Sequence, residues 1–446
     1  MHGRFALGAV VLAAVIVSAS ESQALIIGNS AVPGTGGVDQ NSINTTAPAD
    51  DPGWHNSSAS RSAIYLGDQW VMTATHVETG SIVLPSGEYP VVPNTETVLD
   101  NPSTFLGRSL SSKSDIKLYR IGLHPTTGLT PEQMDSSIKA ITIAPSTPSV
   151  GTEVLAIAAG TTRRVHPSNS NGAWRFDASY NLTGDAAAPN RGYLTESPAV
   201  REKAWATNRI ASPSQLPSTV NNATNAILEI PDLNDTIGVA TSFDQRYNDD
   251  GSEIVSPFPA TDFEFQAFGG DSGGPVFAKN SAGAWELFGV FHGIYLNSGQ
   301  SASAPVPVYG NHSGISDLST QAYYDQIADL RASNEYSIIG DMDLDGIVSG
   351  EILGETATGD LARIVDNYGM THAEQDAQAW VHGDLNMDGV TDIGDFVLWR
   401  GAAAGAVSVQ QFALAVGSSS IAVPEPGMLA LALSAMAAGG GRRRDC

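Results

Sequence analysis

An acid and a hydroxyl lie side by side in the glycine-rich stretch "FGGDSGGPVF", residues 268–277. Glycine allows sharp turns and the close approach of a backbone to another molecule. Ser272, held on such a turn, could act as a nucleophile, or the stretch could form an ordinary glycine-rich hairpin. A serine needs a neighbouring base for nucleophilic attack, because a free hydroxyl is barely ionised at neutral pH. The choice therefore depends on the bases that the rest of the chain supplies.

His76 is the candidate base among the nine histidines, because it follows the apolar, β-branched run "WVMTAT" and is expected where a buried strand ends. A buried carboxylate must then orient the imidazole and stabilise its charged form. Asp115 in "SSKSDIKLYRI" suits that role, since Ile116 and Leu118 place it at the edge of a core strand. A structural histidine and a surface aspartate are the alternatives for these two residues.

The segments "TATH", "DIKL" and "GGDSGGPV" occur in this order and resemble the His, Asp and Ser motifs of the trypsin-like (chymotrypsin-fold, S1-type) serine proteases. The resemblance implies that Ser272 attacks the scissile carbonyl, that His76 takes its proton and that Asp115 holds His76. It also implies an acyl-enzyme intermediate and an oxyanion hole made by the N–H groups of Gly270 and Ser272. The implied fold is mainly β, a chymotrypsin-like double six-stranded β-barrel with a C-terminal helix.

The resemblance gives Asp271 a role in supporting the loop of the nucleophile. In that family the aspartate before the serine pairs with the free amine of an N-terminal Ile-Val-Gly-Gly, and the segment Ile26-Ile27-Gly28-Asn29 resembles that start. The residue directly before Ile26 is neither Arg nor Lys, so activation by tryptic cleavage at this position is not indicated. We expect Asp271 to pair with an amine at residue 25 or 26, or with an internal donor.

Two residues bear on the substrate pocket. The family's pocket base lies six residues before the serine, and this position is Gln266 here. The pocket base therefore has no carboxylate that could bind an Arg or Lys side chain, and the predicted specificity is non-tryptic. His292 lies on or beside the pocket-wall strand "FGVFHGI". It could accept a glutamate side chain, as in bacterial glutamyl endopeptidases, or it could contact the triad residue Asp115.

The elements that would position these residues are short and β-like up to about residue 333. Strands are expected in "AIYLGDQWVMTATHV", with a turn at Gly67-Asp68, and in "DIKLYRIGL", "TEVLAIAA", "NAILEI", "IGVATSF" and "AWELFGVFHGIYL". The segment "LSTQAYYDQIADLRAS" places Tyr323, Ile327 and Leu330 at helical spacing, which predicts an amphipathic helix that closes the first domain. Residues 166–193 and 243–262 are expected to be long loops.

The bulk composition excludes some classes of protein. The 446 residues are enough for two or three folded units. The formal net charge of −25 argues against a nucleic-acid partner, since phosphate binding needs a basic face, and solubility is its simplest explanation. The one cysteine, Cys446, is the last residue, so no internal disulfide can form.

Some of the acidity falls in two loops near the C-terminus. The segment "GDLNMDGVTDIGDF" places hard oxygen ligands at positions 1, 3, 5, 7 and 12 of a calcium loop, with Gly389 at the sharp turn. The predicted ligands are Asp384, Asn386, Asp388, the Val390 carbonyl and Asp395. An acidic turn without a metal is the alternative.

The segment "GDMDLDGIVSG" repeats the first half of this loop with Asp341, Asp343 and Asp345, and Asp360 is the expected closing ligand after an insertion. The pair of half-hands resembles a dockerin type I domain, a small α-helical unit of EF-hand type. That resemblance implies bound calcium and a cohesin-like partner. Dockerin-like repeats that only serve as calcium-stabilised spacers are the alternative.

Both ends of the chain resemble targeting signals. Residues 1–24 combine a weakly basic start, an apolar run and small residues before Leu25, which predicts a secretory signal peptide. The final segment joins "VPEP", an apolar stretch and "RRR", and resembles the PEP-CTERM sorting signal that an exosortase processes in Gram-negative bacteria. A secreted or cell-surface location is therefore expected.

The predicted organisation is a signal peptide at 1–24, a trypsin-like protease domain at 25–335, a dockerin-like calcium domain at 336–415, and a linker and sorting tail at 416–446. The predicted function is a secreted serine endopeptidase acting on proteins or peptides, with no cofactor for catalysis. The alternative is a non-catalytic surface-binding protein on a protease scaffold, attached to partners through the dockerin-like module.

Overall fold

The computed structural model describes residues 25–28, 44–92, 95–127, 129–161, 163–164, 166, 173–195, 202–216, 221–223, 225–230, 233–247, 252–297, 300–301, 305–333, 340–342, 347–354, 356–372, 379–386, 388–403 and 407–417. The predicted signal peptide and sorting tail lie outside these ranges, as do Asp343 and Asp345 of the first acidic loop. None of the helices within the described ranges is long and apolar enough to cross a membrane.

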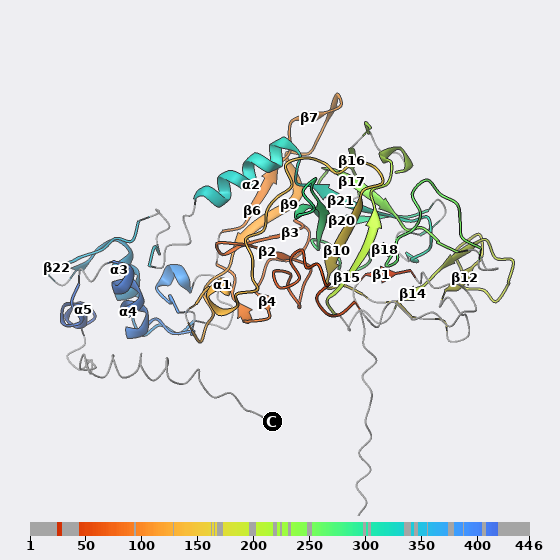
Figure 1. Ribbon diagram of the computed structural model, residues 1–446. Helices are drawn as coiled ribbons and strands as arrows, with labels where there is room; N and C mark the ends of the chain where they lie inside the picture. The colour runs from red at the N-terminus through yellow and green to blue at the C-terminus, as the bar shows by residue number, and fades with distance from the viewer. Residues whose placement is uncertain are drawn as a thin grey trace, which may run out of the picture.

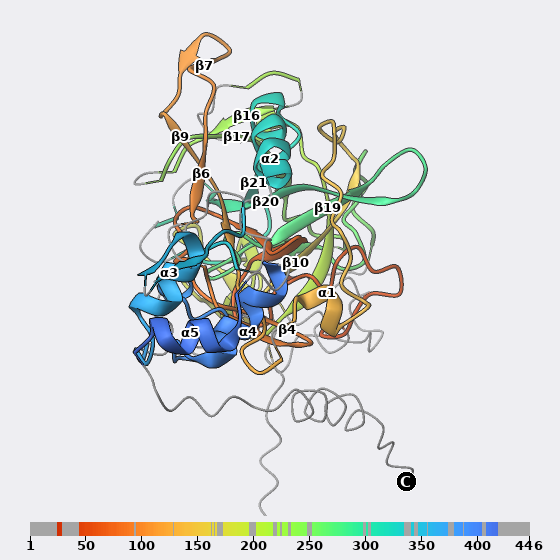
Figure 2. The ribbon, with the colours of Figure 1, turned by 90° about the vertical axis from the view of Figure 1, so that its left-hand side faces the viewer.

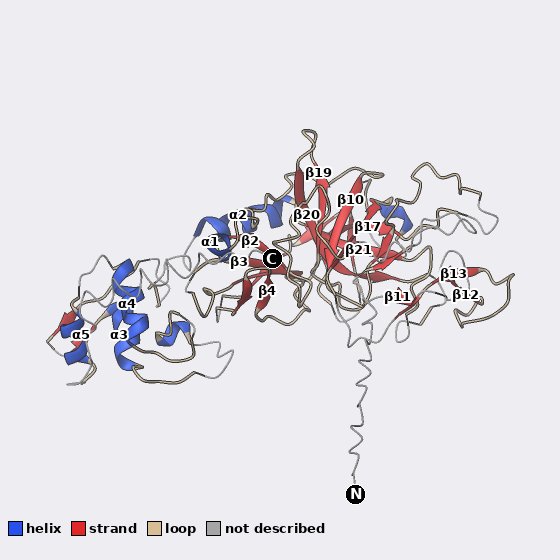
Figure 3. Ribbon diagram, turned by 60° about the horizontal axis from the view of Figure 1, so that its bottom comes forward, coloured by secondary structure: helices blue, strands red, loops and turns tan. Residues whose placement is uncertain are grey.

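Two antiparallel sheets dominate the structure (Figures 1 and 3). The seven-stranded sheet has the order β15 (Ala204–Arg209), β10 (Glu153–Ala158), β19 (Pro275–Lys279), β20 (Trp285–Tyr295), β21 (His312–Asp317), β17 (Thr236–Ser242) and β16 (Ala226–Leu228). The four-stranded sheet has the order β2 (Ile64–Gly67), β3 (Trp70–Thr73), β9 (Lys113–Arg120) and β6 (Thr97–Asp100).

The remaining strands form two-stranded pairs. These are β1 (Ile26–Ile27) with β18 (Phe265–Gln266), β4 (Ile82–Leu84) with β5 (Gly87–Tyr89), β7 (Thr104–Phe105) with β8 (Arg108–Ser109), β11 (Arg163–Arg164) with β14 (Leu194–Thr195), β12 (Trp174–Phe176) with β13 (Asn190–Gly192), and β22 (Ile352–Leu353) with β23 (Thr356–Ala357). The helical segments are α1 (Pro131–Met134), η2 (Pro213–Gln215), α2 (Gln321–Ser333), α3 (Gly359–Asp366), η3 (Trp380–His382), α4 (Ile393–Ala402) and α5 (Val409–Ala415). The predicted mainly β class is confirmed.

The expected hairpin forms as β2 and β3. Gly67, Asp68 and Gln69 turn the chain with positive φ angles of 102°, 50° and 62°. An extended strand needs negative φ angles, so the strand ends where φ becomes positive. Glycine adopts a positive φ at little cost, which suits Gly67 to the start of the turn. The returning strand ends at Thr73, so His76 lies in the turn that follows rather than on the strand.

One buried apolar cluster joins the two sheets. Ile64 and Met72 of the four-stranded sheet pack in the same cluster as Ile157, Phe277 and Val290 of the seven-stranded sheet. Burial of such side chains contributes about 1.5–3 kcal/mol each relative to exposure. The two sheets therefore face each other, and this contact fixes β9 relative to the segments around β19 and β20.

The predicted amphipathic helix is confirmed as α2. Tyr323 and Ile327 are fully buried and Leu330 is half-buried against the cluster between the sheets. The Tyr323 hydroxyl accepts a hydrogen bond from the Ile237 N–H at 3.1 Å. The helix is thus anchored on its predicted face.

Two expectations need refinement. The strand ladders in the described ranges form the four-stranded and seven-stranded sheets and short pairs, so the division into two six-stranded barrels stays a prediction. The segment 166–193 was expected to be a loop, but Trp174–Phe176 and Asn190–Gly192 pair in register within it. Short strands of two or three residues carry too weak a pattern to be seen in sequence.

Helices α3, α4 and α5 lie together at the left-hand end of the molecule in Figure 1, the end that faces the viewer in Figure 2. Trp380, Phe396 and Trp399 are buried in an apolar cluster of their own. Val92 and Leu123, which precede α1 in the chain, belong to the same cluster. The C-terminal region is therefore packed against the β-rich part of the molecule rather than separated from it.

Candidate active site

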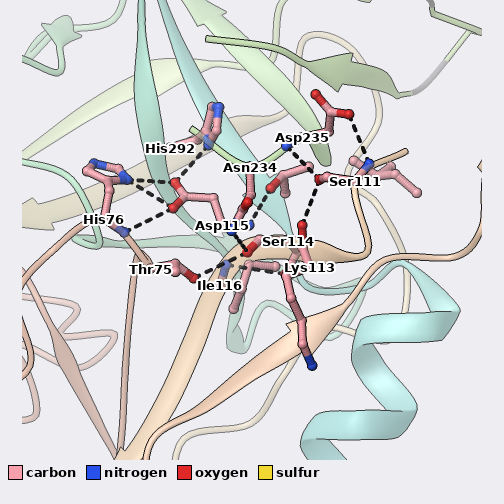
Figure 4. Close-up of polar contacts among 12 residues, drawn as sticks. Thr75, His76, Ser111, Lys113, Ser114, Asp115, Ile116, Asn234, Asp235 and His292 are labelled. Carbon is pink, nitrogen blue, oxygen red and sulfur yellow. Dashed lines mark hydrogen bonds and ion pairs between the residues drawn. The ribbon is translucent and has the colours of Figure 1, made fainter. Parts of the chain in front are cut away.

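His76 and Asp115 lie in direct contact (Figure 4). The His76 Nδ1 is 2.8 Å from Oδ2 and 3.0 Å from Oδ1 of Asp115, and the His76 backbone N–H donates to Oδ1 at 3.2 Å. The Asp115 side chain is 1% exposed, whereas the His76 side chain is 26% exposed. The pair thus combines a buried carboxylate with a partly exposed imidazole.

Backbone bonds hold these two residues together. The Thr75 N–H donates to the Asp115 carbonyl at 3.3 Å, and the Thr75 hydroxyl donates to the Ser114 carbonyl at 3.2 Å. The Asp115 N–H donates to Thr236 Oγ1 on β17 at 2.7 Å, and the Ser114 hydroxyl donates to the Leu99 carbonyl on β6 at 3.0 Å. The turn of His76 and the start of β9 are therefore fixed to each other and to both sheets.

The electrostatics favour an ionised Asp115. Burial acts to raise the pKa of this carboxyl, but hydrogen bonds from His292 and His76 outweigh it, and the pKa lies below its ordinary value. A carboxylate only accepts hydrogen bonds, so the facing Nδ1 atoms are donors. For His76 this tautomer leaves the lone pair of Nε2 available to accept a proton.

Ser272 is half-buried in a tight turn between β18 and β19. Within this turn the Asp271 N–H donates to the Phe268 carbonyl at 3.0 Å, and the Gly274 N–H donates to the Asp271 carbonyl at 2.9 Å. The Gly273 N–H donates to a carbonyl of β20 at 2.8 Å. These bonds hold Ser272 on a constrained loop, as the sequence predicts for a nucleophile.

Gly273 shows that this loop touches the segment that leads to His76. A Cβ on Gly273 would lie 2.0 Å from Thr73 Oγ1 and 2.7 Å from the Ala74 nitrogen, and its φ is +80°. Only glycine allows this approach. Ser272 therefore lies beside the end of β3, although within the described residues its hydroxyl makes no hydrogen bond to His76. Catalytic hydrogen bonds are often long before substrate binds.

The predicted oxyanion donors are available. Within the described part of the chain, neither the N–H of Gly270 nor that of Ser272 donates to a protein acceptor. The Gly270 carbonyl is fixed by the Ser62 hydroxyl at 2.7 Å, and Ser62 Oγ in turn accepts the Ala159 N–H at 2.9 Å. Ser62 was not a candidate in the sequence, because no local pattern distinguishes it. Its bond sets the plane of the Gly270–Asp271 peptide.

Asp271 is fully buried and its Oδ2 accepts the Phe268 N–H at 2.7 Å. The start of the described chain lies beside the strand that leads to this loop. Ile26 pairs with Gln266 and Ile27 with Phe265, and residues 25–27 are 0% exposed. The structure thus places the segment expected to supply an amine against β18, whereas the partner of that amine stays a prediction.

The two pocket candidates are both wholly buried. Within the described ranges, the amide oxygen and nitrogen of Gln266 have no hydrogen-bond partner. His292 Nδ1 is 2.9 Å from Oδ2 of Asp115. Of the two roles considered for His292, the geometry shows the contact with Asp115.

The second acidic loop is closed around its own carboxylates. Asp384 accepts the N–H groups of Asp388 and Gly389 at 3.2 and 3.0 Å, and Gly389 has a φ of +90°. Asp395 accepts the Leu385 N–H at 2.7 Å and is fully buried. Burial raises the pKa of Asp384 and of Asp395, the latter to about 7. Among the described residues, no three His, Cys, Asp or Glu side chains converge into a metal cluster.

The first acidic loop repeats one element of this arrangement. Asp360 Oδ1 accepts the Met342 N–H at 2.5 Å, as Asp395 Oδ1 accepts the Leu385 N–H. Met342 and Leu385 each follow the first acidic residue of their loop. Asp360, although displaced by an insertion, therefore occupies the place in its loop that Asp395 occupies in the other.

Comparisons with known proteins give little beyond this geometry. No family model matches the chain, and no curated protein matches it. Among solved structures, it is similar to neuropsin, a serine protease expressed in the limbic system of mouse brain. The sequences are 13% identical, the TM-score is 0.34, and the match covers 64% of this chain and 98% of that chain. So distant a likeness carries no conclusion about activity, which must rest on the residues themselves.

Proposed function

We propose that the chain is a serine endopeptidase with the triad His76, Asp115 and Ser272. The observation that carries the proposal is the contact of the His76 Nδ1 with a buried Asp115 carboxylate, next to a loop that docks Ser272 against the same strand end. An imidazole that donates its Nδ1–H to a carboxylate has its basic Nε2 on the opposite side of the ring. That is the arrangement that activates a serine hydroxyl.

The chemistry follows from these positions. Ser272 Oγ attacks the carbonyl carbon of a peptide bond, and its proton passes to His76 Nε2. The carbonyl oxygen becomes an oxyanion that the N–H groups of Gly270 and Ser272 stabilise, and loss of one such donor costs roughly 2.7–4 kcal/mol. His76 then protonates the leaving amine, Asp115 stabilises the imidazolium, and water hydrolyses the acyl-enzyme by the same route.

A serine-reactive phosphonate probe tests this proposal on the mature protein. We expect stoichiometric labelling that is absent in Ser272→Ala, and a loss of kcat on the order of 10⁴- to 10⁶-fold in Ser272→Ala and His76→Ala. Ser281→Ala, an exposed serine in the β19–β20 turn, is the matched control and should label normally. Labelling that survives in Ser272→Ala, or an unlabelled folded wild type, would favour the non-catalytic binding protein.

The proposed specificity is non-tryptic. Gln266 supplies a neutral amide whose two polar atoms are buried without partners in the described ranges, and such groups cost about 1–3 kcal/mol each until they are satisfied. A substrate side chain or water that both donates and accepts hydrogen bonds would relieve this cost, whereas an Arg or Lys side chain would find no countercharge. Strong cleavage after Arg or Lys in a peptide library would contradict this assignment.

We also propose that the C-terminal region is a dockerin-like calcium unit. Asp384, Asn386, Asp388, the Val390 carbonyl and Asp395 would hold one ion, with Asp341, Asp343, Asp345 and Asp360 as the counterpart set. The equivalent bonds of Asp360 and Asp395 support the pairing of the two loops. Calcium here would neutralise buried carboxylates and hold the loops together. A cohesin-like partner, export and exosortase processing of the tail are proposals from the sequence resemblances alone.

A further inference from the structure

Asp115 contacts two imidazole rings. His76 and His292 place their Nδ1 atoms 2.8 and 2.9 Å from the same carboxylate oxygen, Oδ2 (Figure 4). We propose that His292 is a positioning residue of the active site, which holds Asp115 and, through Asp115, the base His76 in their working orientation. This inference rests on the proposed function, because it assigns a role within the same triad.

The hydrogen bonds of the Asp115 carboxylate show why a second donor matters. Oδ1 accepts the backbone N–H and Nδ1 of His76, so both donors on that oxygen belong to the same residue that the carboxylate has to hold. His292 is the contact that comes from a different element, strand β20. A carboxylate bonded only to His76 could rotate with it, whereas a bond to His292 fixes its plane from the opposite sheet.

The surroundings of His292 suit a fixed donor better than a substrate receptor. Its side chain is 0% exposed, and within the described ranges its Nε2 is buried without a hydrogen-bond partner. The neutral ring with hydrogen on Nδ1 satisfies the bond to Asp115 and leaves a lone pair, rather than a buried N–H, at Nε2. The ring therefore meets one polar partner in the described chain, and that partner is Asp115.

The strand around His292 also holds the nucleophile loop. Phe291 donates its N–H to the Gly274 carbonyl at 3.0 Å and accepts the Gly273 N–H at 2.8 Å. The pairing of β20 with β21 shifts register between Phe291 and Gly293, so an irregularity falls at His292. Such bulges redirect a side chain. Phe291, which bonds the loop of Ser272, is thus followed directly by His292, which bonds Asp115.

Other charged groups near Asp115 bond elsewhere. Lys113 pairs with Asp100 at 2.7 Å, and Asp235 Oδ2 accepts the Ser111 N–H at 3.1 Å. Within the described chain, the titratable groups in contact with the Asp115 carboxylate are therefore the two histidines. Removal of one donor makes the carboxylate more basic, which strengthens its hold on a proton at His76. The acidic limb of kcat/KM, which reports this proton, should then move to higher pH.

Steady-state kinetics of the mature protein test the assignment. In His292→Leu, loss of a hydrogen bond to a charged group should lower kcat about 10- to 100-fold, with KM changed by no more than about threefold. His292→Asn keeps an N–H donor at a similar reach and should restore most of the loss with an acidic limb near that of the wild type. His312→Leu is the matched control, because His312 lies on the neighbouring strand and makes no contact with Asp115 in the described chain.

Nitrogen-15 histidine NMR gives a readout that does not depend on turnover. We expect two strongly hydrogen-bonded Nδ1–H resonances in the wild type and in Ser272→Ala, one of which disappears in His292→Asn. A single such resonance in the wild type, an unchanged kcat in a folded His292→Leu, or a loss confined to KM for glutamate substrates overturns the positioning role. If His292→Leu does not fold, His292→Asn and the NMR spectra decide.

The two proposals can fail separately. If the wild type shows two resonances but no Ser272-dependent labelling, the contact of Asp115 with both histidines is supported and the proposed protease function is contradicted. If the wild type is active and His292→Leu behaves like His312→Leu, the proposed function is supported and the positioning role of His292 is contradicted. A fall in kcat with an unmoved acidic limb counts against the positioning role, because a general loss of folded protein does not shift a titration.

Discussion

Among the described residues, the Asp115 carboxylate accepts hydrogen bonds from two histidines in different parts of the chain, His76 in the turn after β3 and His292 on β20. One consequence is chemical: each Nδ1 bond fixes a tautomer, and His76 is left with a lone pair on Nε2, opposite the carboxylate. The other is energetic, because the buried carboxylate is stabilised in its ionised form and its pKa lies below the ordinary value. The same bonds therefore set both the chemistry of the site and part of its stability.

The lowered pKa of Asp115 predicts how stability depends on pH. A carboxyl whose pKa is lower in the folded state contributes stability above its unfolded pKa, about 3.9, and loses it as the pH falls through the folded pKa. Asp115→Asn should therefore lower the unfolding free energy by about 1–3 kcal/mol at pH 7. This difference should shrink below about pH 4.

Denaturant titrations of both proteins at pH 7, 5, 4 and 3 measure this difference directly. Asp100→Asn, an exposed carboxylate on the neighbouring strand β6, provides the control. A gap between wild type and Asp115→Asn that stays constant over this range would show that the carboxylate is not stabilised by its charge.

At the scale of elements, the nucleophile loop depends on contacts between segments far apart in sequence. Ser62, 208 residues upstream, fixes the Gly270 carbonyl, and Thr73 closes against Gly273. The short pair β1–β18 lies immediately before this loop. Ser62 and Thr73, at the two ends of the β2–β3 hairpin, therefore hold the loop in place. The start of the described chain pairs with the strand that leads into the loop.

This arrangement shows which features sequence can predict. The hairpin at Gly67, helix α2 and strand β9 follow from local patterns of turn residues and apolar spacing, and all three are present. The bond of Ser62 and the pairing of Ile26 with Gln266 have no local signature, because they arise only when distant segments pack. The two readings of His292 could not be separated for the same reason, since the partner of a buried imidazole is set by tertiary structure.

The pairing of β1 with β18 predicts an effect of the mature N-terminus. Leu25, Ile26 and Ile27 are fully buried, so an amine at residue 25 would need a buried anionic partner, and Asp271 is the nearby candidate. A mature chain that begins at Leu25 should be active without further processing of its N-terminus. One that retains Gln23 and Ala24 should lose at least about tenfold in kcat/KM, the equivalent of one ion-paired hydrogen bond.

N-terminal sequencing of the mature protein, together with assays of the two purified forms, measures this effect. Asp271→Asn should reproduce the loss in the form that begins at Leu25 and add little in the extended form. Full activity in the extended form, or a mature start beyond residue 30, would leave Asp271 with an internal donor as its partner.

At the scale of the whole molecule, the acidic loops and the β-rich part share a hydrophobic contact. Val92 and Leu123 are buried in one cluster with Trp380 and Trp399 of the C-terminal region. Since buried contacts couple the unfolding of neighbouring units, stabilisation of the acidic loops should also stabilise the β-rich part, by a smaller amount. The C-terminal region then stabilises the β-rich part of the molecule.

Calcium removal tests this coupling. A ligand that binds only the folded state adds about 2.7 kcal/mol at a hundredfold excess over Kd. Chelator should therefore lower the melting temperature of the C-terminal transition by several degrees and that of the β-rich part by less. Scanning calorimetry of the mature protein, with and without chelator, measures both. Asp395→Asn should abolish the calcium-dependent shift, whereas Asp366→Asn, an exposed residue at the end of α3, should retain it. Calcium-independent melting of the wild type would leave the two loops as acidic turns.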